Sequence, residues 1–145
     1  MVKKYIKFDN YFLADQVNSR EEALQYMISR VSLHQKLPDD LLHYILEREA
    51  AGNTEIGNQI CMPHTIAPVV EQPFIAVMIL KKPLLWSTDD IKIIFLFCLS
   101  KEYDPQMDLL IDALADFSIS TQTLNAFLQN PTYNQFINSL LRHMS

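Results

Sequence analysis

Two long apolar runs constrain the fold of this chain more than any other feature. The runs "FIAVMIL" (residues 74–80) and "IKIIFLFCL" (residues 91–99) are rich in branched and aromatic side chains. Nearly continuous runs of this kind are typical of strands at the centre of a sheet, where both faces are covered. The longer one is far too short to span a bilayer as a helix. The rest of the chain is therefore expected to supply a covering layer for each face.

Helical patterns stand on both sides of these runs. Ser19 and Glu22 have the spacing of a capping box before an apolar repeat at positions 24, 27, 28 and 31. A second helix is predicted to start near Pro38, to turn residues 41, 42, 45 and 46 inward, and to end at residue 50 or 51, with Gly52 as a left-handed cap. A short strand is expected over residues 59–62.

Three further helices are predicted after the second apolar run. The first has an apolar face at positions 107, 110, 111 and 114, and a short one covers residues 124–128. Thr132 with Gln135 should cap the last, which buries residues 133, 136, 137, 140 and 141. Two helices, a group of strands and three helices indicate an α/β sandwich. With 145 residues, a single domain over 1–145 is expected.

Charge and composition exclude several classes of function. The net charge is −5 and the pI is near 5.2, so a nucleic-acid-binding surface is not expected. The N-terminal "MVKKYIKFDN" lacks the apolar core of a signal peptide. Cys61 and Cys98 form no close-spaced pair, which favours reduced thiols and a cytoplasmic protein.

Glycine is concentrated in one place. The chain has two glycines, whereas average usage would give roughly ten. Both Gly52 and Gly57 precede Pro63-His64 in "GNTEIGNQICMPHT" (residues 52–65), which suggests backbone freedom ahead of one histidine. A loop fixed by proline and presenting one imidazole suits nucleophilic or acid–base chemistry. His34, His43 and His143 lie in helical contexts typical of surface groups.

Other chemistries have weaker support. Cys61 and His64 form a lone C-x-x-H without the further ligands that a zinc site needs, so no metal is expected. Both cysteines fall in predicted buried strands, which disfavours a thiol nucleophile. No P-loop or G-x-S-x-G motif is present, and no cofactor is expected.

His64 therefore remains as a covalent acceptor. A neutral imidazole nitrogen is a competent nucleophile at pH 7 and carries a phosphoryl group well. Arg48, in the last turn of the second helix, could supply a cation to the phosphate, and Thr54 could orient the imidazole or contact a phosphate oxygen. The alternative for Arg48 is a surface ion pair with Glu47 or Glu49, and composition does not choose between the two.

The stretch "EREAAGNTEIGNQICMPHT" (residues 47–65) closely resembles the signature of the fructose/mannitol-type enzyme IIA family of the bacterial phosphotransferase system. Arg48, Glu49, Thr54, Gly57 and Pro63-His64 match it in order and spacing. The resemblance implies a mixed β-sheet sandwiched between helices. It also implies that His64 receives phosphate from the phosphohistidine of the carrier protein HPr with the assistance of Arg48, and that phosphate can pass to an enzyme IIB domain.

Two departures from the family pattern bear on function. Transport-type members place a second histidine where this chain has Gln106 or Met107, and many carry glycine where it has Thr65. Similar domains lie at the C-terminus of transcriptional antiterminators and activators of the BglG/MtlR kind, which the phosphotransferase system regulates. In those proteins phosphorylation reports sugar flux. A transport component and a regulatory sensor therefore both remain open, as does a non-catalytic interaction module that has lost phosphotransfer. Residues 66–69 are expected to form an accessible, mildly apolar surface beside His64.

Overall fold

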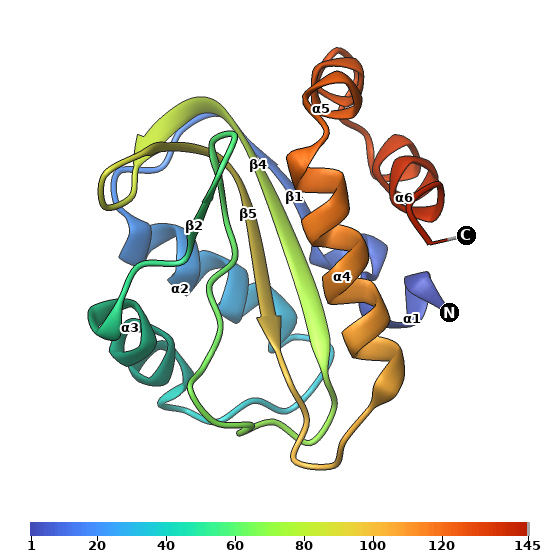
Figure 1. Cartoon of the computed structure of the whole chain (residues 1–145). Coiled ribbons are helices and arrows are strands. Elements are labelled where there is room, and N and C mark those ends of the chain that lie inside the picture. Colours follow the sequence, from blue (N-terminus) through green and yellow to red (C-terminus); the bar gives the residue numbers. More distant parts are fainter. Residues whose placement is uncertain (145) are drawn as a thin grey trace.

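The structure, a computed structural model, describes residues 1–144 as a β-sheet between two helical layers (Figure 1). Within these residues the sheet has five strands in the order β1-β4-β5-β3-β2. The strands are β1 (Tyr11–Ala14), β2 (Glu55–Gly57), β3 (Ile60–Cys61), β4 (Phe74–Leu85) and β5 (Asp90–Cys98). The parallel pairs β1–β4 and β3–β5 and the antiparallel pairs β2–β3 and β4–β5 make the sheet mixed, as the family resemblance implied.

The two apolar runs form the central strands, as predicted. β4 pairs with β5 in a register that places Ile75 opposite Phe97 and Ile79 opposite Ile93. Successive side chains point to opposite faces of the sheet, and both faces are buried. β4 extends five residues beyond the predicted run, to Leu85.

Each face of the sheet is covered by its own helices (Figure 1). α2 (Arg20–Val31) and α3 (Leu41–Ala51) cover the face of the sheet to which Phe74, Ala76 and Met78 of β4 point. α1 (Val2–Tyr5), α4 (Pro105–Ile119), α5 (Thr121–Leu128) and α6 (Tyr133–Leu141) cover the other. None of the helices within residues 1–144 has both the length and the apolar character needed to cross a bilayer.

Two predicted helix caps are confirmed. The Ser19 Oγ accepts from the Glu22 amide at 3.0 Å, and the Thr132 Oγ1 accepts from the Gln135 amide at 3.2 Å. The Glu22 carboxylate returns to the amide of Asn18, one residue before the cap, at 3.1 Å. Both helices therefore begin where the sequence indicated.

Three predictions at helix ends were wrong. The second helix begins at Leu41, because Pro38 instead forms a turn in which its carbonyl accepts from the Leu41 amide at 3.2 Å. Gly52 does end the helix, but with φ 155° and ψ 131° rather than in the left-handed helical conformation. Leu141 is exposed at the end of α6 instead of buried.

Candidate functional site

Pro63 and His64 follow β3 after Met62 and lie beside the C-terminal end of β5. The Phe97 amide donates to the Pro63 carbonyl at 3.1 Å, so the backbone before His64 continues the alignment of β3 with β5. The imidazole of His64 stacks on the Phe97 ring, with centroids 4.7 Å apart and planes 15° from parallel. The Phe97 side chain belongs to the face of the sheet that α4 covers, so the His64 ring lies on the same side of the sheet as α4.

The protonation of the His64 ring follows from one hydrogen bond. Nδ1 lies 2.8 Å from the backbone carbonyl oxygen of Met62. A carbonyl oxygen can only accept, so Nδ1 carries the proton in the neutral ring and Nε2 carries the free lone pair. The residue is half-buried. The ring is thus held on one side by Phe97 and at Nδ1 by Met62, and its nucleophilic nitrogen is Nε2.

The segment before His64 is a tight hairpin and not a flexible loop. β2 and β3 pair with Gly57 opposite Ile60, and Asn58 and Gln59 between them have φ of 53° and 63°. Two positive φ values at the centre of a two-residue connection define a type I′ turn, whose twist matches the strands. Gly57 itself has φ 94°, which a residue with a Cβ rarely adopts. The glycine therefore shapes the hairpin that leads to His64.

Arg48 lies in the last turn of α3. Its Nη1 donates to the Gly52 carbonyl at 2.5 Å, across the end of the helix. Within residues 1–144 it makes no ion pair with Glu47 or Glu49, and Glu47 pairs instead with His43 at 3.8 Å. The guanidinium, half-buried at the surface, keeps most of its five N–H donors for another acceptor.

Thr54 is buried, and its hydroxyl bonds to Glu49 and not to the imidazole. Its hydroxyl donates to Oε1 of Glu49, and Oε2 of the same carboxylate accepts from the Trp86 indole at 3.1 Å. The Thr54 carbonyl accepts from the Met62 amide at 3.0 Å. Sequence reasoning missed the contacts of Glu49 and Trp86. Glu49 matched the family signature, but its residue context suggested only a surface pairing with Arg48, whereas its exposed fraction is 4%.

The residues at the two departures from the family pattern have different surroundings. Thr65 is buried, and its hydroxyl donates to the Ala67 carbonyl at 2.6 Å, which fixes the loop after His64. Met107 packs in the core, whereas Gln106 is exposed in the first turn of α4. A hollow lined by Pro68, Leu99 and Met107 joins that turn to the His64 loop.

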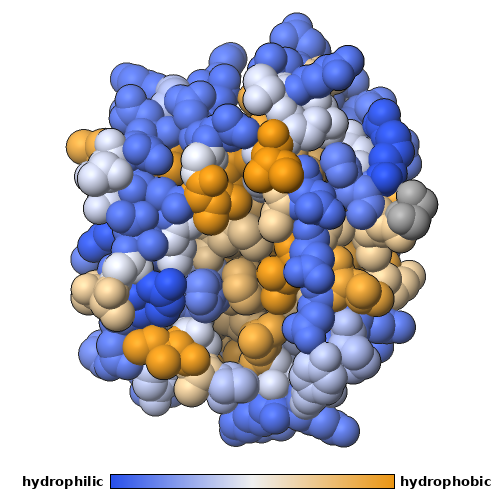
Figure 2. Space-filling view, viewed as in Figure 1, coloured by the Kyte–Doolittle hydropathy of each residue, from blue (hydrophilic) through white to orange (hydrophobic). Residues whose placement is uncertain are grey.

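The surface beside His64 has the expected apolar character. Ile66 is 62% exposed, Ala67 and Pro68 are exposed, and Val69 is half-buried. Figure 2 shows apolar side chains gathered between the strands and α4 on the face turned toward the reader, with hydrophilic ones on both sides. This face is suited to a transient protein contact.

The cysteines are buried thiols that do not pair with each other. Burial raises the pKa of Cys98 to about 12. Burial, with the nearby negative charges of Glu49 and Glu55, raises the pKa of Cys61 well above its ordinary value. Neither sulfur is therefore a thiolate near neutral pH. Within residues 1–144, no cluster of three or more His, Cys, Asp or Glu side chains could hold a metal ion.

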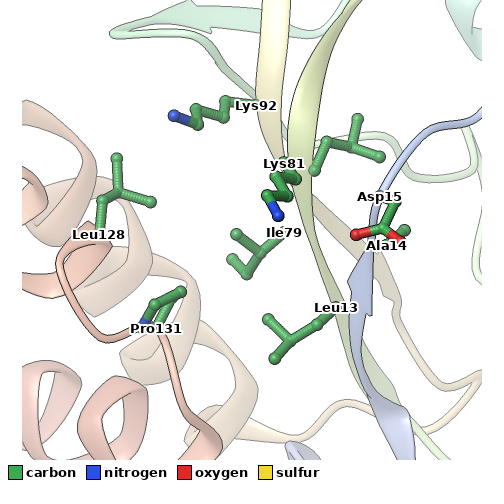
Figure 3. Close-up of a pocket in the computed structure, with 9 residues that line it drawn as sticks. Leu13, Ala14, Asp15, Ile79, Lys81, Lys92, Leu128 and Pro131 are labelled. Atoms are coloured by element: carbon green, nitrogen blue, oxygen red, sulfur yellow. The ribbon is translucent and has the colours of Figure 1, made fainter.

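A larger hollow lies at the other end of the central strands (Figure 3). It measures about 370 Å³ and is lined mainly by apolar side chains of β1, β4 and the turn before α6, with Lys81 and Lys92 pointing toward it. Ile79, which pairs with Ile93, borders it. His64 lies near the Ile75–Phe97 pair, four residues along the strands, or about 13 Å. The hollow is therefore separate from the histidine site.

Comparison with known proteins gives a consistent result. The sequence profile of the family described as "Phosphoenolpyruvate-dependent sugar phosphotransferase system, EIIA 2" matches residues 4–143. The probable licABCH operon regulator of Bacillus subtilis (strain 168) is 25% identical over 132 residues, which cover 91% of this chain and 21% of that protein. The transcriptional regulator ManR of the same organism is 24% identical over 133 residues, covering 92% and 20%. The chain thus spans about a fifth of the length of these relatives.

Solved structures share the fold. Nitrogen regulatory protein IIA-Ntr from Neisseria meningitidis superposes with a TM-score of 0.84 at 15% identity, covering 96% of this chain and 98% of that one. The IIA mannitol protein of Escherichia coli, solved in complex with phosphorylated enzyme IIB, gives 0.67 at 14% identity, covering 92% and 94%.

Proposed function

Because the chain belongs to the EIIA type 2 family of the phosphoenolpyruvate-dependent sugar phosphotransferase system, we propose that His64 accepts a phosphoryl group on Nε2. The observation that carries the proposal is the 2.8 Å hydrogen bond from Nδ1 to the Met62 carbonyl, which leaves the lone pair on Nε2. The stacked Phe97 ring fixes the plane in which that lone pair lies. Orientation of this kind lowers the barrier to transfer.

The proposed donor is the phosphohistidine of HPr. The lone pair of Nε2 forms a bond to phosphorus while the donor's P–N bond breaks, and the electrons of that bond return to the donor imidazole. His64 keeps its proton on Nδ1, and the Met62 carbonyl stabilises the positive charge that the ring gains. The exposed apolar residues Ile66, Ala67 and Pro68 would contact the carrier in a small, transient interface.

Arg48 and Thr54 have different parts in this proposal. Arg48 would stabilise the charge of the transferring phosphoryl group with the N–H donors that its bond to Gly52 does not use. Thr54 would act by positioning, since its hydroxyl is committed to Glu49 and its carbonyl to the Met62 amide.

The biological role proposed is that of a regulatory domain. Both curated relatives are regulators of which this chain matches about a fifth. Phosphorylation of His64 in the cytoplasm would then report sugar flux, and the absence of a second histidine at Gln106 and Met107 would make onward transfer slow. Transfer to an enzyme IIB domain is the competing role, supported by the complex of the E. coli mannitol protein.

The test is phosphorylation with defined components. Incubation with phosphoenolpyruvate, enzyme I and HPr should label the protein with phosphate that is acid-labile and base-stable. His64→Ala should abolish the label, whereas His43→Ala, at an exposed histidine on α3, should keep it. Equal labelling of His64→Ala would overturn the assignment. Absence of label on the wild-type protein would instead favour a non-catalytic interaction module.

A second assay separates sensor from transport component. The labelled protein is mixed with purified enzyme IIB domains of the mannitol and fructose types, and the half-life of the label is followed. A sensor should retain its phosphate for minutes or longer, whereas rapid loss to one IIB domain would identify a transport component.

A further inference from the structure

Hydrogen bonds link the histidine site to a buried carboxylate, which the proposed phosphoryl step does not use. Glu49 has an exposed fraction of 4%, and both of its oxygens accept hydrogen bonds, one from Thr54 and one from Trp86. Burying a carboxylate is costly even when it is hydrogen-bonded. A leucine or glutamine could fill such a position, so the acid calls for a reason other than packing.

The contacts of Glu49 lead to the histidine in three steps. The Thr54 hydroxyl donates to Glu49, and the Thr54 carbonyl accepts from the Met62 amide at 3.0 Å. The Met62 carbonyl then accepts from Nδ1 of His64 at 2.8 Å. Hydrogen bonds are directional, so a shift of the Thr54 backbone changes the direction of the carbonyl that fixes the imidazole.

Glu49 also belongs to the helix end that carries Arg48. Its backbone carbonyl accepts from the Gly52 amide at 3.2 Å, and the Gly52 carbonyl accepts from the Arg48 guanidinium. The Trp86 indole fixes the same carboxylate to the segment between β4 and β5. One side chain thus joins the end of α3, the hairpin before His64 and the central strands.

We propose that Glu49 is a positioning residue for phosphoryl transfer. It fixes the position of the helix end that carries Arg48 relative to the segment that carries His64. Through Thr54 and Met62 it also keeps the proton of His64 on Nδ1. This inference rests on the proposed function for its kinetic consequence. The proton position is a property of the unphosphorylated protein and can be measured without it.

Four variants separate positioning from stability. Glu49→Gln removes the charge and leaves one acceptor oxygen for two donors. Thr54→Val removes the hydroxyl at nearly constant shape, and Thr54→Ser restores it. Glu47→Gln is the matched control, because it changes the neighbouring acid on α3 whose side chain is 56% exposed.

Two measurements are made on each folded variant. The ¹⁵N chemical shifts of the His64 ring report which nitrogen carries the proton, and a single-turnover assay with phosphorylated HPr gives the rate of transfer. We expect Glu49→Gln and Thr54→Val to mix the two tautomers and to slow transfer about tenfold or more, the effect of a misplaced reacting group. Thr54→Ser should recover most of the rate that Thr54→Val loses, and Glu47→Gln should keep both properties.

The inference is overturned if Glu49→Gln and Thr54→Val fold, keep the wild-type proton on Nδ1 and transfer at the wild-type rate. If Glu49→Gln does not fold, the valine and serine variants of Thr54 decide the question. Absence of transfer in the wild-type protein contradicts the proposed function alone, and the nitrogen shifts still decide this inference.

Discussion

Two regions of the molecule, one on each side of the sheet, differ in the interactions that stabilise them, although both faces of the sheet carry an apolar core. On the face of α4 to α6, aromatic rings pack edge to face, with Phe117 at 5.4 Å from Phe136, 5.7 Å from Phe127 and 6.1 Å from Phe95. Beside α3, a buried carboxylate and an indole are fixed by hydrogen bonds. Apolar burial is strong but not directional, whereas hydrogen bonds set orientation. The first region should therefore govern stability, and the second the direction of the Met62 carbonyl that holds the proton of His64 on Nδ1.

The largest effect expected from this comparison is a loss of stability at the aromatic face. Phe117→Ala removes a fully buried ring from contact with three other phenylalanines, which should lower the free energy of unfolding by about 3–5 kcal/mol. The melting temperature should fall by about 10 °C or more, measured by circular dichroism. The ¹⁵N shifts of His64 in the folded variant should match those of the wild type.

Phe8→Ala is the control for this prediction, since Phe8 is 70% exposed and its ring packs against Tyr133 at the edge of the same cluster. Its cost should be below about 1 kcal/mol. A change of the His64 tautomer in Phe117→Ala would show that the two regions are coupled and that the division of roles is wrong.

An intermediate effect is expected at the hairpin, where Glu55 links β2 to the turn between β4 and β5. Its carboxylate accepts from the amides of Ser87, Thr88 and Asp89 at 2.8–3.1 Å. Partial burial opposes ionisation, but these hydrogen bonds outweigh it, so the pKa of Glu55 lies below its ordinary value of 4.5. Glu55→Gln should lower the free energy of unfolding at pH 7 by about 1 kcal/mol, reduced by solvent screening.

The pH dependence of that loss has a definite sign. A group whose folded pKa is depressed stabilises the protein above its unfolded pKa and loses this contribution as the pH falls through the folded value. Urea unfolding of wild type and Glu55→Gln should therefore differ at pH 7 and converge below pH 4.5. A difference that stays constant from pH 7 to pH 3.5 would mean that the charge of Glu55 is not responsible.

Most of the fold could be predicted because its signals are local. The central strands are continuous apolar runs, and the Ser19 and Thr132 caps lie within three residues of their partners. β1 and β2 were missed for a physical reason. β1 is a four-residue edge strand that exposes Leu13, and β2 has three residues of which none is buried, so neither has the burial pattern of a central strand. Their pairing is decided by neighbours far away in sequence or by a turn at Asn58 and Gln59.

The site was predictable only in part. The segment Pro63-His64 stands out because both glycines precede it and because residues 47–65 resemble a family signature. The structure adds the hydrogen bond that assigns the proton. Glu49 looked like a surface acid, since three charged residues in a row at the end of a helix usually face solvent. Its partner Trp86 is 37 residues away in the chain, and no spacing rule links them.

The smallest effect on stability is expected from the exposed face of α3. A polar contact there is in water, whereas the contacts of Glu49 on the same helix are buried. His43 and Glu47 lie 3.8 Å apart, one turn from each other, with side chains 72% and 56% exposed. In a double-mutant cycle of His43→Ala and Glu47→Gln, their coupling energy should be below about 0.5 kcal/mol, and it should vanish in 1 M salt. Neither variant should alter the His64 nitrogen shifts. A coupling energy above 1 kcal/mol would show that polar contacts on this helix stabilise the protein whether they are buried or exposed. The role proposed for Glu49 would then not follow from its burial.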